Sequence, residues 1–195
     1  MQIGKLGRQT SQCDVSKPNE IDALILSEIS YVPFEDIVPS IDSDGAVSLA
    51  DAASKFFEVY GEKFSLGVII PSDILILLKK AAKSKRFSNV SVWGYKSETC
   101  VDTEKQFSAM TFFLPDGKIY IAFRGTDSTI VGWKEDFNLF FQPVIPGHIS
   151  AQHYVQTVAS RTDGEIYIGG HSKGGNLAVY SGVFCNPKIQ KKSEK

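Results

Sequence analysis

Apolar residues recur at helical spacing in three segments within the first 85 residues of the chain. Each segment opens with a polar residue that can accept hydrogen bonds from the free N–H groups of a first helical turn. The pattern predicts three helices, the second ending at Gly61 and the third near Lys83. Their capping residues, in chain order, are Asn19 with Asp22, Ser48 with Asp51, and Ser72.

From residue 90 onward the pattern changes to β-type runs. Residues 90–101 are predicted to form a strand that is kinked at Gly94. The runs 106–114 and 118–124 are apolar on both faces, which is typical of strands inside a sheet covered by helices on each side. Residues 115–117, Pro-Asp-Gly, form a turn signal, so these two runs are expected to make an antiparallel hairpin.

The last third of the chain alternates between helical and β-type patterns. Residues 131–141 are interpreted as a short helix or an ordered loop, and residues 150–160 as a helix. Residues 165–169 form a short β-rich run, which a second apolar helix follows directly. The expected fold class is α/β, with a mixed, mostly parallel sheet, helices on both faces and an N-terminal helical region.

Length and composition indicate one globular unit with ordinary chemistry. The 195 residues are enough for one domain with a sizeable core, which we assign to residues 19–186. A polar arm (1–18) precedes it and a polar tail (187–195) follows. The net charge of −1 provides no strong field for nucleic acid or anionic membrane.

The chain also lacks the sequence signals of export and of metal binding. It carries no N-terminal apolar run and no stretch of about 18 apolar residues, so we expect neither a signal peptide nor a transmembrane helix. The cysteines at 13, 100 and 185 are scattered, which suits a reducing compartment and shows no metal spacing. A cytoplasmic protein is expected.

The strongest chemical signal is the segment 170–174, which has the form G-x-S-x-G between a predicted strand and a predicted helix. Such a turn exposes the Ser172 hydroxyl at a helix N-terminus, where free N–H groups favour a developing negative charge. Gly170 and Gly174 are needed because a Cβ there would collide with the strand or helix, and Gly175 allows close helix packing. The alternative is a structural turn with an incidental serine.

A second constellation, Gly125 and Thr126, follows the predicted strand 118–124. Acyl transfer requires two donors aimed at the tetrahedral oxyanion. One would be the N–H of Lys173, directly after the serine, and Thr126 offers both an N–H and a hydroxyl as the other. The alternative is a simple turn in which Thr126 and Asp127 bond locally.

Four segments together resemble a known family. They are NEIDALILSEISYVPFEDIV (19–38), AFRGTD (122–127), GWKEDFN (132–138) and GGHSKGGNLAVY (169–180). This set resembles the Mbeg-like, lipase-like bacterial branch of the class 3 lipases, within the α/β-hydrolase fold. The resemblance spans about residues 19 to 186.

The resemblance implies hydrolysis of carboxylic esters, often lipids, without metal or organic cofactor. It makes Ser172 the nucleophile and assigns the oxyanion hole to Thr126 and the Lys173 N–H. It also implies supporting roles for the elbow glycines Gly170, Gly174 and Gly175 and for Arg124, Gly125, Trp133, Asp136 and His171, with Trp133 and Asp136 shaping or bracing the site.

The sequence departs from the α/β-hydrolase pattern after the serine. The triad order is Ser, then Asp or Glu, then His, but the 23 residues after Ser172 hold one acid, Glu194, and no histidine. We therefore expect the acid and base of the triad to lie beyond this chain, which would have little activity alone. His171 is interpreted as a packing residue, and His148 and His153 as surface or cap residues.

Partner predictions follow from the same features. The expected substrate is a small-molecule or lipid ester, with no nucleic acid. If the strand at 166–168 lacks its next neighbour, it is an open sheet edge through which the chain can self-associate. Alternatives to the enzyme are a non-catalytic acyl- or ester-binding module and a protein-interaction module. The basic residues between 79 and 86 are interpreted as a solvated helix end, with phosphate or membrane contact as the alternative.

Overall fold

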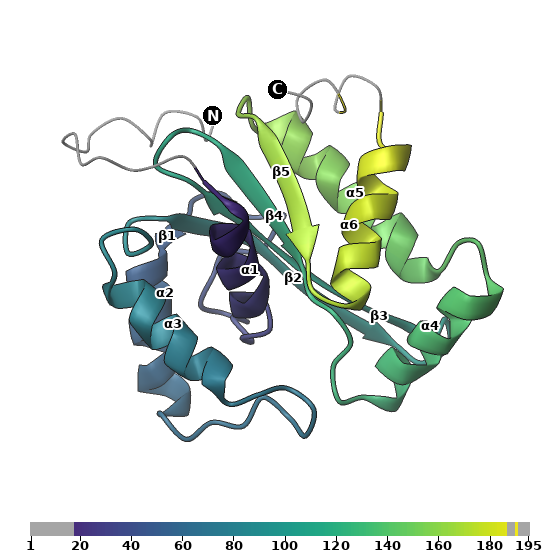
Figure 1. Cartoon of the computed structure of the whole chain (residues 1–195), viewed down its shortest axis with the longest axis horizontal. Coiled ribbons are helices and arrows are strands. Elements are labelled where there is room, and N and C mark those ends of the chain that lie inside the picture. The colour runs from purple at the N-terminus through teal and green to yellow at the C-terminus, as the bar shows by residue number, and fades with distance from the viewer. Residues whose placement is uncertain (1–17, 187–189, 191–195) are drawn as a thin grey trace.

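The computed structural model describes residues 18–186 and residue 190, so most of the predicted N-terminal arm and polar tail lie outside the described residues. The described chain alternates helices with the strands of one sheet (Figure 1). In order, the elements are α1 (Glu20–Ile29), β1 (Val47–Ser48), α2 (Leu49–Tyr60), α3 (Asp73–Lys83), β2 (Ser91–Cys100), β3 (Lys105–Phe113), β4 (Ile119–Phe123), α4 (Ile130–Phe141), α5 (Pro146–Arg161), β5 (Ile166–Gly170) and α6 (Lys173–Phe184).

The sheet is mostly antiparallel, so the expectation of a mostly parallel sheet was wrong. Its five strands lie in sequence order, and β1 to β4 pair antiparallel with their neighbours. Only β4 and β5 are parallel, with Ile121 opposite Ile168. Connection length explains the difference, because short turns join β2, β3 and β4, whereas α4 and α5 supply the long crossover that a parallel pair requires.

Helices cover both faces of this sheet, as the sequence pattern predicted. One core cluster joins α1, α2 and α3 to one face of the strands, and a second joins α5 and α6 to the other face. Side chains alternate accordingly along β4, where Tyr120 belongs to the first cluster and Ile121 to the second. In Figure 1, α1 and α6 lie on either side of β5, and the turn from β5 into α6 is near the middle of the molecule.

Side-chain caps begin helices α1, α2 and α4. Asn19 and Asp22 form both bonds of a capping box at α1, and the Ser48 hydroxyl accepts from the Asp51 N–H at α2. Ser72 makes no such bond at α3. Residues 131–141, which the sequence predicted as either a short helix or an ordered loop, belong to helix α4, and Thr129 caps this helix.

The outer surface of α4 is apolar and exposed. Five large side chains on this 12-residue helix are about half or more exposed, and they recur at helical spacing. They form a continuous outward stripe, a surface feature typical of interaction sites. Its residues are Ile130, Trp133, Phe137, Phe140 and Phe141.

Candidate active site

Ser172 lies in a strained turn between β5 and α6. Its φ of 57° and ψ of −127° lie in a region that non-glycine residues adopt at a cost. Two residues separate the end of β5 at Gly170 from the start of α6 at Lys173, so the chain reverses sharply at the serine. Ser172 is exposed, and its hydroxyl makes no hydrogen bond to any part of the chain that the structure describes.

Three glycines allow the strand and helix to approach closely at this turn. A Cβ on Gly174 would lie 2.1 Å from the Phe123 carbonyl oxygen, and one on Gly170 would lie 2.5 Å from the Gly174 carbonyl carbon. A Cβ on Gly175 would lie 3.1 Å from the Gly170 oxygen. The first two separations are below 3 Å, so positions 170 and 174 have no room for a side chain, and position 175 is tight.

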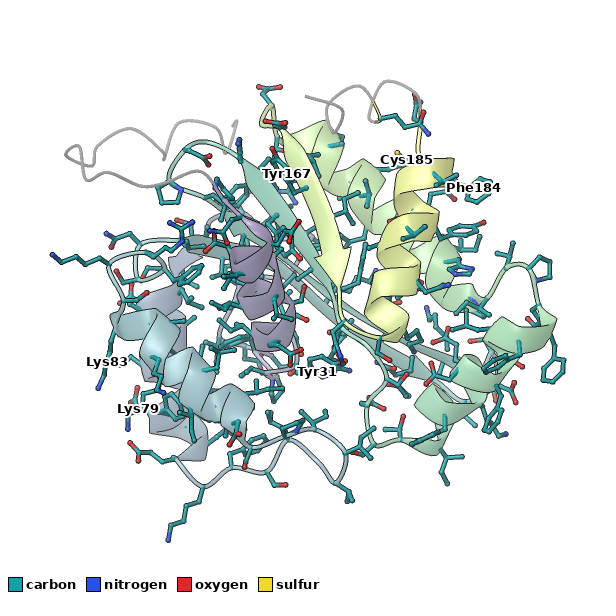
Figure 2. The ribbon with its side chains drawn as sticks, viewed as in Figure 1. Tyr31, Lys79, Lys83, Tyr167, Phe184 and Cys185 are labelled. Atoms are coloured by element: carbon teal, nitrogen blue, oxygen red, sulfur yellow. The ribbon has the colours of Figure 1, made fainter. Side chains whose placement is uncertain are left out.

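The loop after β4 packs directly against the serine. A Cβ on Gly125 would lie 3.3 Å from the Ser172 Cβ and 2.2 Å from the Tyr31 hydroxyl oxygen. Tyr31 also lies 3.3 Å from His171 Nδ1, and burial raises its pKa to about 12, so the phenol stays protonated. Figure 2 shows Tyr31 below the end of α1, close to the turn that joins β5 to α6.

The two backbone N–H groups predicted to form the oxyanion hole have no hydrogen-bond partner in the described chain. Within the described residues, neither the Thr126 N–H nor the Lys173 N–H donates a hydrogen bond to another group. The Thr126 hydroxyl is committed elsewhere, because it donates to Asp136 Oδ2 over 2.5 Å. Of the two donors that the sequence offered at Thr126, only the N–H therefore remains available.

The Lys173 side chain is part of a buried polar cluster that sequence reasoning missed. Its Nζ donates to Glu135 Oε2 over 2.7 Å, and the two side chains are 1% and 0% exposed. Glu135 stands beside Asp136 in the quoted segment GWKEDFN, but its spacing gave no sign that it is buried. The lysine is thus both a backbone neighbour of the serine and a buried cation.

Of the residues expected to support the site, Arg124 and Trp133 lie in contrasting places. Arg124 is buried and donates to Asp127 Oδ2 over 3.3 Å, and its Nε has no partner in the described chain. Trp133 is half exposed on the outer stripe of α4, away from the inward-facing Asp136.

The three histidines do not contact the Ser172 hydroxyl. His171 projects toward α1 with its side chain 56% exposed. His148 is buried, accepts from the Ile145 N–H at Nδ1 and bonds Asn176 through Nε2 over 2.6 Å. The Nε2–H tautomer satisfies both bonds. His153 is exposed on α5.

A protein-family model matches residues 81–195, which is more than half of the chain and runs from the end of α3 to beyond α6. The model is that of the Mbeg1-like proteins. The chain belongs to the Mbeg1-like family. Membership agrees with the Mbeg-like branch that the sequence resembled and suggests a lipase-like hydrolase. No curated protein and no solved structure matches this chain.

Two further observations concern the whole described region. None of its helices is long and apolar enough to cross a membrane. None of its histidine, cysteine or carboxylate side chains gather in groups of three or more that could hold a metal ion.

Proposed function

We propose that this Mbeg1-like protein is a serine hydrolase of carboxylic esters that forms an acyl-enzyme on Ser172. In this proposal the N–H groups of Thr126 and Lys173 stabilise the oxyanion, and Asp136 holds Thr126 in place. The substrate is a small-molecule or lipid ester, and the site of action is the cytoplasm. No metal or organic cofactor takes part in these steps.

One observation carries the proposal: the strained, exposed Ser172 lies against the Gly125–Thr126 loop, and the N–H groups of Thr126 and Lys173 donate to no other group in the described chain. A strained turn persists only where the surrounding structure enforces it, and such turns cluster at active sites. Free N–H groups at a developing oxyanion contribute the largest single term in many acyl transfers. An incidental serine would require neither feature.

We further propose that this chain alone is a weak enzyme, because none of its histidines bonds Ser172. Removing a triad member from serine proteases costs about 10⁴- to 10⁶-fold in rate. On p-nitrophenyl esters we expect turnover at least about a thousandfold below the roughly 10 s⁻¹ of an ordinary enzyme. Ordinary turnover that disappears in Ser172→Ala would contradict this by requiring a base within the chain.

A fluorophosphonate probe, read by mass spectrometry of the labelled peptides, tests the nucleophile itself. An oxyanion hole without its triad still accelerates acyl transfer about 10³- to 10⁴-fold over water. We therefore expect slow labelling of Ser172, far above that of the exposed Ser54 on α2. Equal labelling of the two serines, or no labelling of Ser172, would contradict the nucleophile proposal and indicate that the turn at Ser172 is purely structural.

A second candidate is a protein-interaction module, which the outer edge of β5 favours. Among the described strands, β5 pairs only with β4, and Tyr167 on it is 38% exposed. An open edge is a template for pairing with another strand, including that of a second copy. Ile168→Pro removes one backbone N–H of β5, which points either to the open edge or to β4. Tyr167→Lys adds a charge to β5 and keeps every backbone N–H. Light scattering that shows a monomer at high concentration, unchanged by Tyr167→Lys, would exclude edge-mediated self-association.

A further inference from the structure

Glu135 lies at the junction of four elements. From α4 its carboxylate accepts hydrogen bonds from Lys173 Nζ on α6, from the Gln106 N–H on β3 over 3.1 Å and from the Gly147 N–H on α5 over 2.8 Å. Glu135 is fully buried. A Cβ on Gly147 would lie 2.9 Å from Glu135 Oε1, so a glycine is needed for this approach.

Lys173 is equally satisfied. Besides Glu135, its Nζ donates to the Gln106 backbone oxygen over 2.8 Å and to Gln106 Oε1 over 2.7 Å. These three bonds use all three protons of the ammonium group. The cation is therefore held in one position, directly after the nucleophile in the chain.

A buried ion pair of this kind is an inefficient way to stabilise a fold. Desolvating both charges offsets most of their attraction, and well-packed apolar replacements are often neutral or stabilising. What the pair does supply is a defined geometry, because the bonds among Glu135, Lys173 and Gln106 tie α4 and α6 to each other and to β3.

The geometry at Glu135 also affects Asp136, the next residue on α4. Asp136 accepts from the Thr126 hydroxyl, so two consecutive carboxylates connect α4 to the elbow and to the loop after β4. We propose that Glu135 is a positioning residue: by fixing α4 through Lys173, it keeps Asp136 where it holds the Thr126 N–H in line with the Lys173 N–H. This role rests on the proposed function.

A variant with an apolar pair separates positioning from stability. Glu135→Leu/Lys173→Met replaces both charges with side chains of similar size, and Lys55→Met/Glu58→Leu does the same to an exposed pair on α2 as a control. The first variant should unfold at a lower temperature than the wild type, because the buried N–H groups of Gln106 and Gly147 lose their acceptor. At a temperature where both proteins are folded, we expect it to label Ser172 at least tenfold more slowly at saturating probe. The control should label at the wild-type rate. Unchanged labelling of the first variant would overturn the proposal and leave a purely structural pair.

Hydrogen exchange provides a readout that does not need a reactive serine. We expect the peptide around Thr126 to exchange faster in Glu135→Leu/Lys173→Met, while the β3 peptide around Met110 is unchanged. If wild-type Ser172 does not label at all, the hydrolase proposal fails, and exchange alone then decides the role of Glu135. Equal exchange around Thr126 in variant and wild type would overturn that role.

Discussion

Gly125 offers the sharpest test of how the site is assembled. In Gly125→Ala the new methyl group would lie 2.2 Å from the Tyr31 hydroxyl oxygen and 2.6 Å from the His171 carbonyl oxygen. Overpacking of this kind costs about 1–3 kcal/mol. The free energy of unfolding should fall by about 3 kcal/mol, the upper end of this range, because the His171 carbonyl oxygen belongs to the backbone and cannot rotate away from the methyl group.

Two further substitutions make the measurement specific. Gly182→Ala places the same methyl group on α6, where nothing lies within 4 Å, so it should stabilise the protein by up to about 1 kcal/mol through helix propensity. Tyr31→Phe removes the closer of the two contacting oxygens. The double variant Gly125→Ala/Tyr31→Phe should therefore lose about 1 kcal/mol less than the sum of its single losses.

Urea unfolding followed by circular dichroism measures these differences as shifts of the midpoint at constant slope. The reasoning would be refuted if Gly125→Ala unfolded at the wild-type midpoint, because the Gly125–Thr126 loop would then not be packed against the elbow. Strict additivity with Tyr31→Phe would refute the narrower claim that the phenol is the first obstacle.

Three other outcomes are expected. The hydrogen bond from Arg86 lowers the pKa of Asp22. The pair therefore stabilises the fold fully above the unfolded pKa of about 4, and this stabilisation is lost as the pH falls through the lower folded pKa. In thermal melts, Asp22→Asn should lower the melting temperature more at pH 6 than at pH 3. Tyr154→Phe removes a buried hydroxyl that donates to the Gly94 oxygen over 2.7 Å and should cost about 1–2 kcal/mol in urea titrations. Thr126→Val keeps the backbone N–H but loses its anchor, so fluorophosphonate labelling should slow about tenfold, less than the roughly 10²- to 10³-fold cost of a deleted donor.

Sequence reasoning succeeded where local chemistry decides the structure. Asn19 and Ser48 cap their helices because a side-chain oxygen two or three residues from a free N–H needs no distant partner. The G-x-S-x-G turn likewise carries its own requirements within five residues. The start of α5 at Pro146, earlier than expected, is also locally encoded, because proline suits a first helical turn.

It failed where distant segments decide. The direction of the strands depends on which connections are long enough to cross over, and the expectation of a mostly parallel sheet gave too little weight to the short turns between β2, β3 and β4. The burial of Glu135 depends on Lys173, 38 residues away, and no local pattern marks it. The commitment of the Thr126 hydroxyl to Asp136 could be seen only once both segments were in place.

The backbone at Ser172 sets a trade-off for any further change to this sequence. Holding a non-glycine residue at a φ of 57° and a ψ of −127° costs about 1–3 kcal/mol, which glycine would largely recover. Selection for stability alone would therefore replace Ser172 with glycine and remove the hydroxyl. A library screened only for foldedness should enrich glycine at this position, and the same library screened for labelling by a fluorophosphonate probe should exclude it.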